Sequence, residues 1–385
     1  MDCNLCGNIL VDEIYASGSA KSLTSLCIVF DAPTHVYSCH WCGHVQSGEI
    51  NNIDAYYDNG YDILVESEEE DQIYEVISGA NIYRTEHQVG TLVDKVDLTP
   101  GTKILDYGCA KSSTMRALMG KNPGVSGYLF DVSDRYIPFW RKFLPEDQWA
   151  TYAIPPAWDE QFDLVTSFFS LEHMARPQDA LRQISRVLRT KGIIYGIVPN
   201  VFTNTADMIV VDHVNHFTKV SLSYLLRNNG FEVLELDDSS HRGALIFKAS
   251  KEVSPPGGAD APAPKVVREV IEEARKIAQF WKGIGTKVKD FERSVPGTER
   301  LALYGAGFYG AFIKSCLQHS ERIACIIDQN PFLQGRAVSG ISVITPAELP
   351  YDIHVVLVGL NPANSRKLIE GIPEFGKRQL TFFFL

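Results

Sequence analysis

The sequence lacks long apolar runs, and none reaches the roughly 18 consecutive apolar residues of a membrane-spanning helix. The first residues, MDCNLCGNIL, have neither the basic region nor the apolar stretch of a secretion signal. We therefore expect a cytoplasmic protein that does not insert into a membrane. The chain also lacks a repeat of fixed period, and its 385 residues predict two or three domains.

An excess of positive charge is absent as well. Lysine and arginine together number 36, against 47 aspartates and glutamates, and the net charge is −11. Such a chain repels a phosphate backbone unless a local basic stripe compensates, and the sequence shows none. We therefore expect no nucleic-acid partner.

Cysteine is scarce, but four of the eight cysteines stand in two tight pairs. CNLCGN contains Cys3 and Cys6, and CHWCGH repeats the spacing with Cys39 and Cys42; a glycine follows each pair. In a reducing compartment such pairs indicate metal ligands rather than disulfides. Four thiolates complete a tetrahedral shell without a water, so we predict a structural zinc ion. Unpaired thiols are the alternative.

The remaining pattern divides the chain into segments with different periodicity. Strand-like runs alternate with helical ones in TKILDYG, VSGYLFD, FDLVTSFFSL, GIIYGIVPN, FEVLEL and GALIFKAS, which predicts βαβ units and a parallel sheet. SPPGGADAPAP favours an extended linker, and a second, smaller α/β alternation closes the chain. We predict a zinc-binding domain at 1–79, an α/β domain at 80–250, a linker with one or two connecting helices at 251–297, and a C-terminal α/β domain at 298–385.

Polar residues stand where three successive predicted strands end. TKILDYG carries Asp106 and Gly108, and VSGYLFD ends in Asp131, 25 residues further on, where a carboxylate accepts ribose hydroxyls. The third run, FDLVTSFFSLEHM, closes in Glu172 and His173. Because such strand ends meet in one crevice, we predict a nucleoside-binding cleft. Its predicted lining is Asp106, Gly108, Ala110, Asp131, Ser170, Glu172 and His173.

This combination of D-x-G, an acid on the next strand and an F-D-L-V strand closing in L-E-H resembles the class I methyltransferases. The resemblance implies S-adenosylmethionine as the cofactor. Small residues replace the further glycines that the family usually carries after Gly108, and Lys111 departs from its pattern. The G-x-G-x-x-G fingerprint of NAD binding is absent from this turn. A βα unit without a cofactor is the alternative.

Two histidines follow in VVDHVNHFTKVSL, ahead of a helix that Thr218 is expected to cap. A histidine oriented by a carboxylate removes a proton from a hydroxyl or from a carbon beside a carbonyl. We predict His213 as the base, with Asp212 and His216 in the same cluster. Structural histidines remain an alternative, as does a divalent metal site at these three residues.

The order of the segments resembles the three-domain sugar C-methyltransferases, which join a four-cysteine zinc domain, a central methyltransferase domain with a Rossmann-like sheet and a C-terminal Rossmann-like domain. The resemblance implies a sugar or nucleotide-linked sugar as substrate, with C-methylation through an enolate. Asp212 replaces the family's glutamate and His216 its tyrosine, so O-methylation stays open. The family's tyrosines after the zinc domain correspond to Tyr56, Tyr57 and Tyr61, as substrate contacts or as packing at a domain junction; Tyr57 is our catalytic candidate.

The last segment contains LYGAGFYGAF, in which Gly305, Gly307 and Gly310 satisfy G-x-G-x-x-G, and Asp328 ends the next predicted strand. Read alone, this motif indicates NAD binding and a sugar oxidoreductase. The resemblance instead implies a domain that helps to hold a nucleotide-sugar, since IIDQNPFLQG matches the family's D-x-N-P and Q-G pattern. A non-catalytic scaffold that binds S-adenosylmethionine or a nucleotide-sugar is a further alternative.

Overall fold

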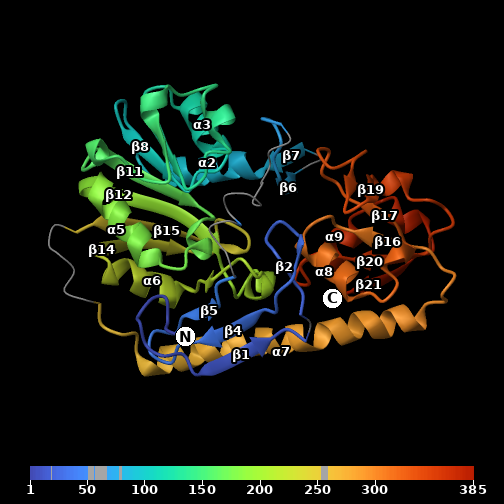
Figure 1. Cartoon of the computed structure of the whole chain (residues 1–385). Helices are drawn as coiled ribbons and strands as arrows, with labels where there is room; N and C mark the ends of the chain where they lie inside the picture. Colours follow the sequence, from blue (N-terminus) through green and yellow to red (C-terminus); the bar gives the residue numbers. More distant parts are fainter. Residues whose placement is uncertain (19, 51–55, 57–66, 78–79, 253–258) are drawn as a thin grey trace. The chain divides into compact units, whose positions relative to one another are not determined.

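The computed structural model describes residues 1–18, 20–50, 56, 67–77, 80–252 and 259–385 (Figure 1). The chain forms two compact units. Unit 1 comprises Met1–Ile14, Val36–Asp207 and Asp212–Ala274, and unit 2 comprises Tyr15–His35, Met208–Val211 and Arg275–Leu385. Among the described helices, none combines the length and the apolar character that crossing a membrane requires.

Unit 1 is built around a seven-stranded sheet in the order β10, β9, β8, β11, β12, β15, β14 (Figure 1). The order reverses at β8, which lies between β9 and β11, and ligands bind at such switch points. The strands are β8 (Lys103–Tyr107), β9 (Ser126–Asp131), β10 (Trp149–Thr151), β11 (Phe162–Phe168), β12 (Leu188–Pro199), β14 (Phe231–Asp237) and β15 (Ala244–Lys251).

The five strands from β8 to β12 are parallel; the sequence predicts four of them, and the short β10 was missed. The prediction of an all-parallel sheet is wrong for β15, which runs antiparallel to both of its neighbours, β12 and β14. Only residues 238–243 separate β14 from β15. Such a link is too short for the crossover that parallel strands need. The sheet is therefore mixed.

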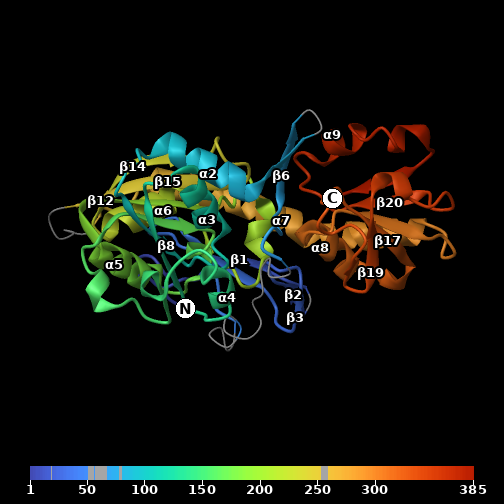
Figure 2. The same cartoon turned by 90° about the horizontal axis from the view of Figure 1, so that it is seen from above.

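Side chains that alternate along the strands of this sheet pack into two separate apolar cores, one on each face. Leu105, Val165 and Ile194 face one core, whereas their neighbours Ile104 and Leu164 face the other. The first core is completed by α5 (Pro177–Val187) and α6 (Lys219–Asn228), and the second by α2 (Arg84–Lys95), α3 (Ser113–Lys121) and α4 (Ile137–Trp140) (Figure 2). Both faces are therefore covered, as a sheet of mainly parallel strands requires.

Helix α6 begins as the sequence predicts. Thr218 caps it, because its side chain accepts a hydrogen bond from the backbone N–H of Ser221, while the Ser221 hydroxyl binds the backbone N–H of Thr218. Leu222 and Leu225 of the helix are fully buried. The helix start is therefore well fixed, and so is the loop that leads into it.

Smaller sheets complete the N-terminal part of the fold. The strands β1 (Asp12–Ala16), β4 (His35–Ser38), β5 (Val45–Ser47) and β13 (Asn215–His216) form a four-stranded sheet in the order β1, β4, β5, β13. Because β13 pairs antiparallel with β5, Asn215 lies opposite Gln46 and His216 opposite Val45. The chain ahead of α6 is thus held against the segment that follows the second cysteine pair. A separate hairpin pairs β6 (Ile73–Ile77) with β7 (Ala80–Tyr83).

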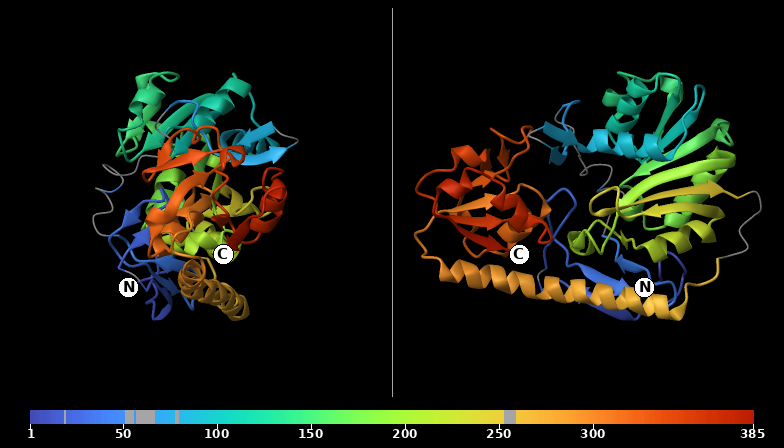
Figure 3. Two further views of the ribbon diagram at one scale, coloured as in Figure 1. Left: turned by 90° about the vertical axis from the view of Figure 1, so that its right-hand side faces the viewer. Right: turned by 180° about the vertical axis from the view of Figure 1, so that it is seen from behind.

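Unit 2 contains a six-stranded sheet in the order β18, β19, β17, β16, β20, β21. Its strands are drawn in orange to red in Figure 3. All its strands are parallel except β18, which pairs antiparallel at the edge. The six strands are β16 (Leu301–Tyr304), β17 (Ile323–Ile327), β18 (Ala337–Val338), β19 (Ile341–Ile344), β20 (Val355–Val358) and β21 (Thr381–Phe384). Unit 2 also contains the helices α8 (Phe308–Cys316) and α9 (Ser365–Glu370) and a separate pair of short strands, β2 (Ser22–Leu23) and β3 (Val29–Phe30).

The connecting segment forms one helix, α7 (Pro264–Ser294). The apolar positions that predict it are buried, among them Val267, Ile271 and Ile277.

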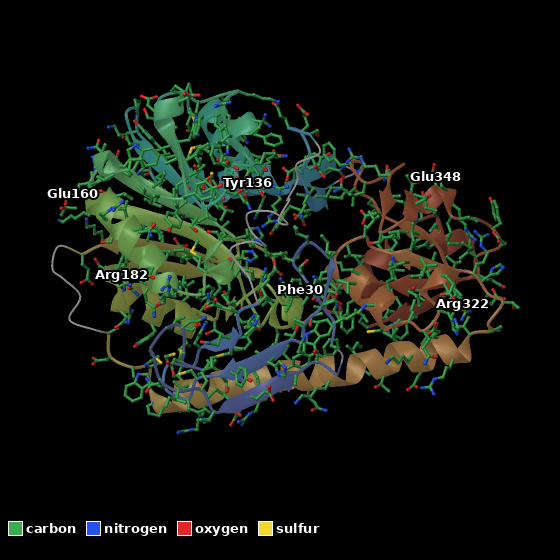
Figure 4. All side chains as sticks on the ribbon, viewed as in Figure 1. Phe30, Tyr136, Glu160, Arg182, Arg322 and Glu348 are labelled. Carbon is green, nitrogen blue, oxygen red and sulfur yellow. The ribbon has the colours of Figure 1, made fainter. Side chains whose placement is uncertain are left out.

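Charged side chains such as Glu160 and Glu348 are exposed on the outer surface of their own units (Figure 4).

Candidate active site

The turn after β8 is closely packed against the loop after β11. Gly108 has a φ of +71°, and a Cβ on this residue would lie 2.8 Å from Cβ of Ser170. The backbone N–H groups of Gly108 and Cys109 both donate to the carbonyl of Phe130, at 2.8 and 3.1 Å. Only glycine fits this position, for reasons of conformation and of space.

Two further residues of this turn adopt the left-handed conformation that glycine favours. Ala110 has a φ of +45° and Ser112 a φ of +57°. For a residue with a side chain this conformation costs about 1–2 kcal/mol. Hydrogen bonds offset it: the indole of Trp140 donates to the Ala110 carbonyl at 2.8 Å, and the Ser112 hydroxyl donates to Asp106 at 2.8 Å. The turn therefore has a glycine-like shape without the family's further glycines.

The two predicted carboxylates, Asp106 and Asp131, accept hydrogen bonds from different kinds of donor. Asp106 is buried, and its oxygens accept from the hydroxyls of Ser112 and Thr166. Asp131 accepts from the backbone N–H of Ala110 at 2.8 Å and of Ser133 at 3.1 Å. Burial raises the pKa of each to about 6, against the lowering effect of these hydrogen bonds. Because a carboxylate has about four acceptor positions, Asp131 retains capacity for further hydroxyl donors.

Lys111 points to another part of the chain. Its ammonium donates to the backbone carbonyls of Ser67 at 2.9 Å and Glu70 at 2.8 Å, and burial lowers its pKa. Glu68, in the same acidic segment, forms ion pairs with Arg116 and Lys142. The departure from the family pattern at Lys111 is therefore explained: this lysine ties the segment 67–70 to the turn.

Backbone strain also marks the end of β11. Phe169 has a φ of +52°, which is an outlier for a bulky side chain. The Arg84 guanidinium lies 3.9 Å from the centre of the Phe169 ring. The backbone N–H of Phe169 donates to the carbonyl of Ile197 at 2.7 Å. The hydroxyls of Ser170 and Ser167 are 2.6 Å apart. This anchored turn leads into the short helix η3 (Leu171–His173).

Glu172 and His173 are the polar residues of η3. Glu172 is 1% exposed, and its Oε2 has no hydrogen-bond partner among the described residues. Burial raises its pKa to about 8, so the carboxyl holds its proton at neutral pH. His173 donates from Nδ1 to the carbonyl of Asp212 at 3.1 Å, and burial with the nearby charge of His213 lowers its pKa to about 4.

Both predicted histidines bind a carboxylate that the sequence analysis missed. Asp207, in the short helix η4 (Thr205–Ile209), accepts from Nδ1 of His213 at 2.6 Å and from Nδ1 of His216 at 3.0 Å, one on each oxygen. The Nε2 of His216 lies 2.8 Å from the hydroxyl of Ser47. No sequence motif marks Asp207 or Ser47, because these contacts depend on how the loops fold.

The pKa values of His213 and Asp207 are shifted in opposite directions. Burial alone would lower the pKa of His213, but the hydrogen bond and charge of Asp207, together with the charge of Asp212, raise it to about 9. Burial would raise the pKa of Asp207, whereas its two histidine partners lower it to about 2. His213 is therefore a stronger base than a free histidine.

The remaining predicted catalytic residues have different outcomes. Asp212 is fully buried and accepts from the hydroxyl of Tyr56 at 3.3 Å. His216 is fully buried, and its two ring nitrogens contact the Ser47 hydroxyl and the Asp207 carboxylate. Tyr57 and Tyr61 lie outside the described residues.

The four paired cysteines converge. Their sulfur atoms all lie within 4.8 Å of one another, with Cys3 to Cys42 at 3.6 Å and Cys6 to Cys39 at 3.5 Å. Tetrahedral zinc with Zn–S bonds of about 2.3 Å separates its sulfurs by about 3.8 Å, so the arrangement suits a zinc ion.

The two cysteine turns have the same backbone design. The N–H of Gly7 donates to the carbonyl of Cys3 and that of Gly43 to Cys39, both at 2.9 Å. Gly7 and Gly43 have φ values of +72° and +73°. The repeated spacing in the sequence thus folds into a repeated turn.

Asn215 joins the cysteine turns to the histidine loop, and the sequence analysis missed it too. Its side-chain oxygen accepts from Asn4 at 3.0 Å and lies 3.1 Å from Nε2 of His44. Its amide donates to the carbonyls of Leu171 and Met174, on either side of the Glu172–His173 pair. One side chain therefore contacts both cysteine turns and the end of η3.

The glycine loop of unit 2 is also tightly built. A Cβ on Gly310 would lie 2.0 Å from the carbonyl oxygen of Gly305. The backbone N–H of Ala306 donates to the Asp328 carboxylate at 2.9 Å, and Asn330 donates to its other oxygen at 2.8 Å. The G-x-G-x-x-G spacing thus forms a real strand–turn–helix between β16 and α8.

Residues 83–236 match a protein family described as a methyltransferase domain. This stretch contains the turn after β8, Asp131, the Glu172–His173 pair and His213. No curated protein gives a significant match.

Solved structures show similarity over under half of the chain. An S-adenosylmethionine-dependent methyltransferase from Mesorhizobium loti is 13% identical, with 43% of this chain and 98% of that chain covered and a TM-score of 0.36. The [4+2]-cyclase SpnF is 16% identical, with coverage of 48% and 87% and a TM-score of 0.37. The CurJ carbon methyltransferase is 13% identical, with coverage of 43% and 52% and a TM-score of 0.34.

The family match covers the five parallel strands β8 to β12 and the strand ends where the polar side chains gather. The chain therefore contains a class I methyltransferase domain and is an S-adenosylmethionine-dependent methyltransferase.

Proposed function

We propose that this enzyme transfers a methyl group to a carbon beside a carbonyl group of a sugar or a nucleotide-linked sugar. The observation that carries the proposal is the closeness of an acid and a base. One ligand-type atom each of Glu172, His173 and His213 lies within 4.8 Å of the others. A carboxyl that stays protonated beside an imidazole of raised pKa is the pair that enolate formation needs.

The residues of the turn after β8 suit S-adenosylmethionine. The Gly108 turn leaves no Cβ in the crevice, and Asp131, at the end of the neighbouring strand, keeps acceptor capacity for ribose hydroxyls. We assign Asp106 to shaping the turn, because both its oxygens bind side chains of the turn or of β11. When bound, S-adenosylmethionine supplies an electrophilic methyl group on a sulfonium.

His213 is the proposed base. Its Nδ1 hydrogen points to Asp207, so the neutral ring has its lone pair on Nε2. Nε2 removes the proton from the carbon beside the carbonyl, and the carbon takes up the methyl group. The protonated carboxyl of Glu172 donates a hydrogen bond to the oxygen on which the enolate charge develops. Asp212, His216 and Tyr57 remain proposed members of the site.

The sugar rests on the resemblance to the three-domain sugar C-methyltransferases. Unit 2 supports it with a parallel sheet and a glycine loop, and we propose that residues 298–385 help to hold a nucleotide-sugar. We propose a zinc-binding domain at 1–79, a methyltransferase domain at 80–250 and a connecting segment at 251–297. The zinc ion has a structural role, since four thiolates leave no open position.

Proton exchange in D2O tests this function without the methyl donor. The wild-type enzyme is expected to exchange the hydrogen beside the carbonyl of a nucleoside-diphosphate-linked keto-sugar. With S-adenosylmethionine, mass spectrometry should detect the methylated sugar and S-adenosylhomocysteine. His213→Gln should abolish both, whereas His40→Gln, which alters an exposed histidine paired with Asp12, should not. Methyl transfer to a hydroxyl without carbon exchange would establish O-methylation instead.

A further inference from the structure

The carboxylate of Asp207 is shared by two imidazoles. Asp207 and His216 are each at most 1% exposed, and His213 is 8% exposed. The two contacts use different oxygens and measure 2.6 and 3.0 Å. A buried carboxylate must accept hydrogen bonds, and here two Nδ1–H groups supply them.

These contacts determine where each ring carries its proton. Because an ionised carboxylate only accepts, both histidines must donate from Nδ1. Neutral His216 then has its lone pair on Nε2, where it accepts from the hydroxyl of Ser47 at 2.8 Å. Neutral His213 has its lone pair on Nε2, the atom that a base needs. The network Ser47–His216–Asp207–His213 is therefore consistent in every donor and acceptor.

The backbone holds the far end of this network. Ser47 ends β5, which pairs with β13, and its N–H donates to the carbonyl of Val214 at 3.1 Å. Asp207 itself donates its N–H to the carbonyl of Asn204 at 3.0 Å. Asp207 is therefore held by His216 at its carboxylate and by Asn204 at its backbone, independently of its contact with His213.

We propose that Asp207 is the positioning residue of the active site: it fixes the tautomer and the direction of His213, and His216 with Ser47 fixes Asp207 in turn. This inference rests on the proposed base function of His213, while the tautomer itself can be tested separately. In this role Asp207 touches neither S-adenosylmethionine nor the substrate. Among the residues that the structure describes, Asp212, Glu172 and His173 are further ionisable groups around His213, and His216 binds the second oxygen of Asp207.

Long-range ¹H–¹⁵N spectra of histidine-labelled enzyme, recorded as a function of pH without any ligand, test the positioning directly. Wild-type His213, assigned with His213→Gln, should show the Nδ1–H tautomer and a pKa above its usual value. In Asp207→Asn the side chain has one acceptor oxygen instead of two and carries no charge, so an acceptor for the two Nδ1–H groups is lost, the tautomer should change and the pKa should fall. Asp212→Asn is the matched control, because Asp212 acts on His213 through its charge, and it should preserve the tautomer.

Two spectroscopic outcomes would overturn the proposal. The first is an unchanged His213 tautomer and pKa in Asp207→Asn. The second is selective broadening of the His213 and His173 resonances of the wild type by Mn²⁺, because a cation held by Glu172, His173 and His213 would occupy Nε2.

Kinetics with S-adenosylmethionine and a nucleoside-diphosphate-linked keto-sugar test the catalytic consequence. Asp207→Asn should lower kcat by roughly 10²-fold or more, with the KM for S-adenosylmethionine unchanged. His216→Gln, which keeps a donor toward Asp207, should lose less. Full activity in Asp207→Asn would overturn the positioning role. If the wild type methylates no sugar probe, the proposed function fails, while the spectra still decide what Asp207 does to His213.

Discussion

Gly108 and Ser170 pack so closely that one added methyl group on residue 108 would lie 2.8 Å from Cβ of Ser170. The two residues follow β8 and β11, the neighbours at which the strand order reverses. Their contact joins the cofactor turn to the loop that carries Glu172 and His173. The space between the two halves of the proposed site therefore depends on the absence of a single side chain.

Gly108→Ala should weaken S-adenosylmethionine binding at least tenfold, which corresponds to about 1.4 kcal/mol. The turn must move to relieve the clash, and the left-handed backbone adds about 1–2 kcal/mol of strain. Calorimetric titration and thermal unfolding measure the two effects. Gly90→Ala is the control, because Gly90 lies within α2 with open space around its Cβ position. It should stabilise the enzyme by up to about 1 kcal/mol, and equal donor affinities in both variants would contradict our assignment of the turn.

Ala110→Gly should have the opposite effect on stability. Removing the Cβ relieves about 1–2 kcal/mol of left-handed strain, while the more flexible unfolded chain takes back about 0.5–1 kcal/mol. The net gain should reach up to about 1 kcal/mol in denaturant unfolding. Ala117→Gly, in the middle of α3, should instead cost about 1 kcal/mol. A loss of stability in both variants would mean that the Ala110 conformation is not strained.

The parts of this site that could be predicted from the sequence are those whose residues are neighbours in the chain. The repeated C-x-x-C-G spacing, the D-x-G turn and the Thr218 cap each lie within a few residues. Strand alternation predicted four of the five parallel strands for the same reason, and it missed β10, which has only three residues. The antiparallel β15 was missed because its direction depends on a short connection, which alternation does not register.

The hydrogen-bond network around His213 could not be predicted in this way. Ser47 and His216 are 169 residues apart, and Asn4 and Asn215 are 211 apart. The sequence led us to group His216 with Asp212, its neighbour in the chain. The fold instead pairs His216 with Asp207, because the loop turns back between them. A nearby carboxylate in the chain was thus a poor guide to the carboxylate that holds the base.

Cys39→Ser should remove the proposed zinc ion and lower the unfolding temperature. Metal analysis should change from one zinc per chain to none, and the loss of a structural zinc site costs several kcal/mol. The damage should spread to the histidine loop, because Asn4 and His44 both contact Asn215. Cys27→Ser, outside the cluster, is the control and should retain the metal. A zinc-free wild type that is equally stable would exclude a structural metal.

The pH dependence of turnover follows from the charge that His213 carries. Its pKa in the folded enzyme is about 9, so at neutral pH most molecules hold the proton and lack the base. As the pH rises, the imidazole loses this proton and kcat/KM should increase, and it should fall again at higher pH as the Glu172 carboxyl loses the proton that it donates.

Glu172, with a pKa of about 8, titrates in the same range and interacts with His213, so the profile reports the pair. In Glu172→Gln the group that donates to the enolate oxygen no longer ionises, so kcat/KM should level off at high pH where that of the wild type falls. Asp207→Asn should move the rising limb to lower pH, because the charge that raises the pKa of His213 is gone. A rising limb at the same pH in Asp207→Asn would show that another group is the base.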